Sequence, residues 1–258
     1  MTRPQPAWIG VLVGGVSELF QSDLDLGRLA VERLQAEDLG PGVLVEELHY
    51  GAVAVAQRLE DLRPAALVLV SAVRRGHSPG TVLRRRLDHP ELTPAQVQAA
   101  VGDAVTGYVH PDLVVEVAAA LGALPPRTVA VEVEPAVTGS GEGLSRPATA
   151  GLEVALDLVR AEVRRAPLLT LAGELWPLVG DDRLADSTAL TALRALLEEL
   201  AGLDRDGRWG RTFACRDQLK LGIAQNAGSA GMDHRDWGLW WALVEELDRL
   251  EAVEAVPS

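Results

Sequence analysis

The stretch of the chain richest in reactive side chains begins where an apolar run ends. Residues 65–72, AALVLVSA, are apolar except for Ser71, and Arg74, Arg75 and His77 follow in a loop that contains a Pro-Gly turn. In an α/β protein, binding and catalytic groups collect at such strand ends. A hydrolytic metal site would need a carboxylate here, because a neutral hydroxyl is a weak ligand. The loop instead suits charge-assisted hydrogen bonds to an acidic or carboxyl-terminal segment of a bound polypeptide, with a merely exposed polar loop as the alternative.

Three other local motifs do not carry the chemistry that they first suggest. Gly14-Gly15 follows an apolar run, but the Gly-x-Gly-x-x-Gly spacing of a dinucleotide site is missing. Ser140 lies between glycines, yet it follows Pro135 in a loop and not at a strand-to-helix turn, which favours a flexible loop over a nucleophile. Cys215 has arginines near it but no histidine in the same stretch to act as a base, which favours a core thiol.

The composition restricts the classes of function. The chain has 258 residues, 48% of them hydrophobic, and a formal net charge of -13, which disfavours nucleic acid and anionic membranes as partners. A single cysteine excludes disulfides within the chain. The N-terminal residues MTRPQPAWIG do not resemble an export signal, so we expect a cytoplasmic protein. The apolar runs fall short of the roughly 20 residues of a membrane helix, so no membrane insertion is expected.

Apolar runs that alternate with helical patterns predict the elements that position these side chains. The predicted strands are residues 8–13, 42–48, 65–72 and 127–134, and the predicted helices are 23–39, 52–62, 111–124 and 148–164. Continuous Val/Leu runs between helices are typical of a parallel sheet covered on both faces. We therefore expect an α/β domain over residues 1–165, with a mostly parallel twisted sheet between helices.

The remaining residues, 166–258, form a predicted helical C-terminal extension. Its helices are expected at residues 187–203 and 236–253. The second of these carries Trp237, Trp240 and Trp241 along one stripe. Such a stripe packs on the sheet domain in one interpretation and docks a partner in the other, since exposed aromatic stripes mark interfaces.

Three longer stretches together resemble one protein family. LVLVSAVRRGHSPGTVLRR, YVHPDLVVEVAAALGALPPRTVAVEVEPA and GEGLSRPATAGLEVALDLV are similar to the hydrogenase maturation proteases. The resemblance covers roughly residues 8–165 in order, and includes the turn at residues 79–81 and the Val-Glu-Pro stretch at 133–135. It implies a twisted sheet between helices. It also implies a relation to endopeptidases that trim the C-terminal tail of the [NiFe]-hydrogenase large subunit after nickel insertion.

The resemblance implies where the metal-recognising residues of that family would lie. If Gly27 takes the place of the glycine after the family's acidic pair, the first ligand position holds Leu24. Ser71 stands at the strand-end aspartate, and His110 alone retains the family's residue. His49 replaces the aspartate that usually opens the turn after the second strand. An aliphatic group and a neutral hydroxyl cannot replace two anionic ligands.

Asp23, Asp25, Glu18 and His49 are the candidates for substitute ligands. The two aspartates flank the first ligand position, so a shifted helix start would turn one of them inward, and Glu18 is near in sequence. His49 and His110 would coordinate a soft or borderline metal if they lie close together. As alternatives, the aspartates are solvated acids favoured beside a helix N-terminus, and His49 is a hydrogen-bonded residue of the core or rim.

The sequence therefore predicts a protease-like fold without metal chemistry, a non-catalytic assembly or chaperone factor for [NiFe]-hydrogenase maturation. Its expected partner is the hydrogenase large subunit or its precursor, with other maturation proteins as further partners. One alternative is an active nickel-dependent maturation endopeptidase with relocated ligands. Another is an unrelated binding or structural protein on the same fold, since fold alone fixes no function. No cofactor is expected, and under the endopeptidase hypothesis the nickel belongs to the bound substrate.

Overall fold

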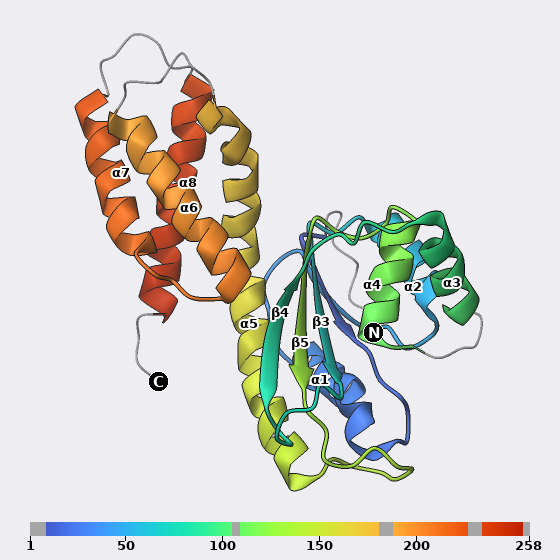
Figure 1. Ribbon diagram of the computed structural model, residues 1–258. Coiled ribbons are helices and arrows are strands. Elements are labelled where there is room, and N and C mark those ends of the chain that lie inside the picture. The colour runs from blue at the N-terminus through green and yellow to red at the C-terminus, as the bar shows by residue number, and fades with distance from the viewer. Residues whose placement is uncertain (1–8, 105–108, 181–187, 227–233, 255–258) are drawn as a thin grey trace. The chain divides into compact units, whose positions relative to one another are not determined.

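The computed structural model describes residues 9–104, 109–180, 188–226 and 234–254. The chain divides into two compact units, Met1–Val163 and Arg164–Ser258. The first contains a sheet flanked by helices, and the second is helical throughout its described residues (Figure 1).

A five-stranded sheet organises the N-terminal unit. Its strands are β1 (Val11–Gly15), β2 (Val43–Glu47), β3 (Ala66–Ala72), β4 (Val82–Leu87) and β5 (Arg127–Val133). They lie in the order β2-β1-β3-β5-β4, and all neighbours pair in parallel except β4, which runs antiparallel to β5. The predicted mostly parallel α/β fold is confirmed. Strand β4 was not predicted, because its arginines conceal the alternation expected of a strand.

Helices cover both faces of this sheet. They are η1 (Ser22–Asp25), α1 (Leu26–Gln35), α2 (Ala52–Leu62), α3 (Pro94–Ala104), α4 (Pro111–Ala120) and the start of α5 (Arg146–Leu175). Side chains of α2 and α4 share one hydrophobic cluster with Leu12, Leu67 and Leu69 of the strands. The strand positions in between face the other way, toward α1 and α5. Helix α3 was not predicted.

Two glycines allow α1 to lie directly against the end of β1. A Cβ on Gly15 would lie 2.3 Å from the carbonyl oxygen of Gly27. A Cβ on Gly27 would lie 2.4 Å from the carbonyl oxygen of Val16. Any side chain at either place would push the helix away from the sheet.

The basic run at residues 84–86 alternates between the two faces of strand β4. Arg84 donates to Glu162 of α5 on one face, at 2.8 Å, and Arg85 donates to Asp112 of α4 on the other, at 3.1 Å. This alternation follows from the period of two of a strand. Arg84 and Arg85 are therefore part of the internal ion pairing of the fold, and Arg86 donates to the backbone carbonyls of Thr128 and Pro126.

Helix α5 is longer than its predicted range and continues past Pro167. Proline removes one N–H donor from a helix. Here Leu168, Leu169 and Leu175 lie on the buried face and contribute to the core of the second unit. That apolar packing offsets the lost hydrogen bond.

The C-terminal unit packs helices around a leucine-rich core. Its elements after α5 are η2 (Trp176–Gly180), α6 (Thr188–Asp206), α7 (Thr212–Asn226) and α8 (His234–Glu254). Helix α7 was not predicted, and the predicted helix start at Ser187 lies outside the described residues. In the part of the chain that the structure describes, no helix is both long and apolar enough to cross a membrane.

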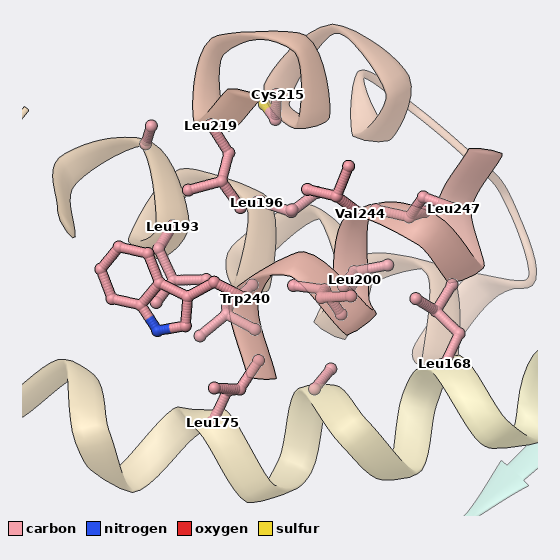
Figure 2. Packing of buried hydrophobic residues seen from close by; sticks show 14 of the residues in the cluster. Leu168, Leu175, Leu193, Leu196, Leu200, Cys215, Leu219, Trp240, Val244 and Leu247 are labelled. Atoms are coloured by element: carbon pink, nitrogen blue, oxygen red, sulfur yellow. The ribbon is translucent and has the colours of Figure 1, made fainter. Parts of the chain in front are cut away.

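The tryptophan stripe of α8 is divided by this packing. Trp240 is 1% exposed, and Figure 2 shows it among Leu175, Leu193 and Leu200 in the core of the helical unit. Trp241 is 44% exposed, and the side chain of Trp237 lies outside the described residues. The expectation that Trp240 contributes to a docking face is therefore wrong. The predicted stripe included residues of two different faces, because neighbouring residues in a helix, such as Trp240 and Trp241, point about 100° apart.

Candidate functional site

The carboxyl ends of strands β3 and β5 bring two polar side chains together inside the N-terminal unit. Ser71 pairs with Glu132 in the parallel register, so their side chains lie on the same face of the sheet. Each residue is only 1% exposed. Within the described part of the chain, the Ser71 hydroxyl oxygen has no hydrogen-bond partner. The strand end therefore holds a buried acid beside an unsatisfied hydroxyl.

Helix α4 begins at this strand end, and His110 is its N-cap. The His110 Nδ1 accepts a hydrogen bond from the backbone N–H of Asp112 at 3.3 Å. The Asp112 carboxylate lies 3.5 Å from the same nitrogen. Pro111 occupies the first helical position, where the missing N–H costs nothing. The retained histidine therefore has a local structural role at a helix terminus.

Arg75 connects the strand end to the helix. Its guanidinium donates to Glu132 at 2.8 and 2.9 Å and to Asp112 at 2.9 Å. These hydrogen bonds, first the ones to Glu132 and then the one to Asp112, raise the pKa of Arg75. Burial would raise the pKa of Asp112, but Arg75, His110 and Arg85 outweigh it and the pKa is lowered. The group is a charged network with Arg75 at its centre.

The loop that carries Arg75 is folded around the carboxylate of Glu134. One Glu134 oxygen accepts from the backbone N–H of Arg75 at 2.8 Å and from that of His77 at 3.2 Å. Burial acts to raise the pKa of Glu134, but hydrogen bonds from the backbone at Arg75, His77 and Gly76 lower it. Successive backbone N–H groups that converge in this way form an anion-binding nest. The nest in this protein is occupied by the protein's own carboxylate.

The three predicted polypeptide-binding residues of the loop therefore differ in their surroundings. The Arg75 side chain donates to Glu132 and Asp112 and faces inward. This differs from the prediction that Arg75 contacts a bound polypeptide. Arg74 and His77 are exposed, and the Arg74 guanidinium donates to the hydroxyl of Thr138. Sequence spacing cannot separate inward from outward arginines in an irregular loop.

Asp23 is fully buried, and its carboxylate is bound by the loop that follows β5. Its oxygens accept from the backbone N–H groups of Ala136, Val137 and Ser145 at 2.6–2.8 Å. The hydroxyl of Ser145, which is also the N-cap of α5, donates to Asp23 at 2.8 Å. Burial would raise the pKa of Asp23, but these hydrogen bonds lower it. The interpretation of Asp23 as a solvated acid is wrong, because the aspartate is buried and links η1 to the loop that follows β5.

The other three candidate ligands, within the described residues, belong to no group of three or more side chains that could hold a metal ion. Asp25 is buried and accepts hydrogen bonds from the Arg28 guanidinium at 2.6–3.0 Å, so it too is not solvated. Glu18 is partly exposed, and its backbone N–H donates to the carbonyl of Leu24. His49 lies after β2 with its Nδ1 3.2 Å from a carboxylate oxygen of Glu47.

The family's metal-recognition site does not fit the residues that stand here. Leu24 is half-buried and offers no ligand atom, and Ser71 offers a neutral hydroxyl. Across the ranges described above, no group of three or more His, Cys, Asp or Glu side chains is arranged to hold a metal ion. The arrangement at the strand end can instead hold a positively charged group between two carboxylates.

Four residues that build this network were not predicted from the sequence: Arg85, Asp112, Glu132 and Glu134. Glu132 carried a usable signal, since it interrupts the apolar run TVAVEV of a strand buried on both faces. A buried acid requires a cation or hydrogen-bond donors nearby. A cavity of about 470 Å³ lies beside the network, with Arg85, Asp112 and Glu116 in its wall.

Comparisons with known proteins give structural neighbours only. No family model matches the chain, and no curated protein matches it. One similar solved structure is the hydrogenase maturating endopeptidase HybD from E. coli, with 25% identity, a TM-score of 0.43, and coverage of 61% of this chain and 94% of that chain. A hydrogenase 2 maturation peptidase from a Thaumarchaeota archaeon has 23% identity, a TM-score of 0.42, and coverage of 58% and 94%.

A third neighbour is the [NiFe] hydrogenase maturation protease HycI from Thermococcus kodakarensis. It has 20% identity, a TM-score of 0.44, and coverage of 61% of this chain and 93% of that chain. The three neighbours bear the name of the family that the sequence resembles. Likeness at this level assigns neither an activity nor a partner to this protein.

Proposed function

We propose that this protein is a non-catalytic assembly factor for [NiFe]-hydrogenase maturation, which binds the large subunit or its precursor in the cytoplasm without cleaving it. The proposal rests on the sequence resemblance over roughly residues 8–165 and on the chemistry of the strand-end site. It involves no resident cofactor.

One observation carries the non-catalytic part of the proposal. Asp23, one of the two carboxylates adjacent to Leu24, accepts hydrogen bonds from three backbone N–H groups and one hydroxyl of the loop that follows β5. It cannot turn toward a metal without leaving three backbone N–H groups unsatisfied, each at a cost of about 1–3 kcal/mol. Relocated ligands would therefore require the fold itself to rearrange, which disfavours the endopeptidase hypothesis.

The proposed contact with the polypeptide uses the exposed part of the loop after β3. Arg74 and His77 face outward there, while Glu134 and the inward-facing Arg75 hold the loop in one conformation. A preorganised loop loses less entropy on binding than a mobile one. We expect Arg74 to interact with acidic or carboxyl-terminal groups of the partner.

The decisive experiment separates binding from cleavage. Purified protein is incubated with nickel-loaded large-subunit precursor, with an active maturation protease as the positive control, and the precursor is followed by intact mass spectrometry and pull-down. We expect a complex and an unchanged precursor mass. Loss of the precursor tail with wild-type protein but not with His110→Ala would establish the endopeptidase instead.

A paired variant tests the binding surface. Arg74→Ala should weaken capture of the precursor severalfold and leave the melting temperature unchanged, because Arg74 is exposed. Arg63→Ala, at an exposed arginine that ends α2, is the matched control and should not weaken capture. Failure of wild-type protein to capture either the precursor or other maturation proteins would favour an unrelated binding or structural role.

A further inference from the structure

The strand-end carboxylates lie along two edges of one planar cation. Glu132 accepts from Nε and Nη2 of Arg75 at 2.9 and 2.8 Å. Asp112 accepts from Nη2 at 2.9 Å, and its second oxygen lies 2.8 Å from Nη1. All three nitrogens of the guanidinium are therefore engaged, in the fork geometry that suits carboxylates.

The same geometry is unsuited to a metal ion. A divalent ion requires its oxygen ligands at roughly 2.0–2.6 Å from a single point. Here the oxygens of Glu132 and Asp112 are spread around three different nitrogens of Arg75. This agrees with the finding that the described residues contain no group of His, Cys, Asp and Glu suited to a metal.

The buried hydroxyl of Ser71 is an independent indication that the site is arranged around the guanidinium. Ser71 lies beside Glu132 in the register and on the same face of the sheet. A buried hydroxyl next to a carboxylate ordinarily donates to it. Within the described chain the Ser71 oxygen has no such bond, while both oxygens of Glu132 contact Arg75.

We propose that the strand end is a guanidinium-binding site whose resident occupant is Arg75. A positive charge fixed to the chain then stands in the region where the family resemblance implies that a metal is recognised. Removal of the Arg75 side chain should leave a pocket that selects a free alkylguanidinium over a divalent metal ion. This inference goes beyond the proposed function and can be tested without any hydrogenase.

The experiment uses Arg75→Ala in the full-length chain, with ethylguanidinium at millimolar concentration as the probe. Isothermal titration calorimetry should show saturable binding to the variant at least tenfold tighter than to wild-type protein. Arg74→Ala removes a neighbouring exposed arginine and should behave as wild type. Adding Glu132→Gln to Arg75→Ala should abolish the binding, because the acceptor charge is lost.

Two outcomes would overturn the proposal. One is a folded Arg75→Ala protein that binds no ethylguanidinium. The other is uptake of Ni²⁺ or Zn²⁺ by Arg75→Ala more tightly than ethylguanidinium, which would make the site a blocked metal centre. If Arg75→Ala does not fold by itself, ethylguanidinium should restore its native circular dichroism spectrum where Ni²⁺ does not. Absence of that rescue would equally contradict the proposal.

Discussion

A buried glutamate held by two arginines lies at each face of the sheet in the N-terminal unit. The two sites differ in their exposure to solvent. On the α5 face, Glu162 contacts Arg84 and Arg127. All three side chains are at most 8% exposed. Burial would raise the pKa of Glu162, but the two arginines lower it. This site is closed and structural.

On the α4 face, Glu132 contacts Arg75 and Arg85, whose side chains are 23% and 34% exposed. Asp112 joins the network, and a cavity lies beside it. Both sites pair carboxylates with two arginines, so the types of residue alone do not distinguish a structural site from a functional one. Solvent access does, since the arginines of the second site are markedly more exposed than those of the first.

The closed site should show the largest effect of losing its acid. Glu162→Gln leaves two nearly buried guanidinium groups without this carboxylate, and breaking such a buried pair costs about 3–5 kcal/mol. The free energy of unfolding in urea measures the loss. Glu153→Gln on the same helix removes an exposed pair with Arg33 and should cost less than about 1 kcal/mol. Equal effects of the two changes would refute the distinction.

Asp23 provides a third buried acid, held by N–H and O–H donors and not by arginines. Asp23→Asn should cost about 2–4 kcal/mol, because several hydrogen bonds to a charged group are weakened. Asp38→Asn, at an exposed aspartate that accepts a hydrogen bond from the N–H of Gly40, is the control in the same urea titration.

The lowered pKa of Asp23 also predicts in which direction the free energy of unfolding changes with pH. Its stabilisation is fully present above the carboxyl's unfolded pKa of about 4 and is lost as the pH falls through the lower folded pKa. Unfolding measured from pH 6 to pH 2 should therefore show a shallower acid loss for Asp23→Asn than for wild type. Parallel curves would contradict the role of the ionised carboxylate.

The open site should tolerate the loss of its acid better than the closed one. Glu132→Gln should cost about 1–3 kcal/mol, because water can solvate the partly exposed Arg75 and Arg85. The sharpest measurement is the comparison with Glu162→Gln under identical conditions. If Glu132→Gln is the more destabilising, solvent access is not what separates the two sites.

The smallest effect is expected at the unsatisfied hydroxyl. Ser71→Ala removes a buried polar atom that makes no hydrogen bond in the described chain, so it should be neutral or stabilising by up to about 1 kcal/mol. Ser17→Ala is the matched control, because the buried Ser17 hydroxyl accepts from the N–H of Arg28 at 2.7 Å. The control should destabilise by about 1 kcal/mol in thermal unfolding, and a larger loss at Ser71 would reveal a partner for its hydroxyl.

Elements with strong hydrophobic periodicity were predictable, and those defined by long-range ion pairs were not. The strands at β1, β3 and β5 and the helix α2 follow from runs of Val, Leu and Ala. Strand β4 escaped prediction because two of its arginines are neutralised by Glu162 and Asp112, residues far away in sequence. The strand-end network was not predicted for the same reason, since its charged members come from the loop between β3 and β4, from β4, from α4 and from β5.

The sequence by itself determined that the expected ligand positions hold Leu24 and Ser71, because the identity of a side chain limits which atoms it can offer. Only the tertiary structure decided that the Asp23 carboxylate accepts hydrogen bonds from the loop after β5. It also decided that Arg75 turns inward between Glu132 and Asp112. The physical reason is that a charge in a low-dielectric interior must find a partner, and that partner is fixed by packing in space.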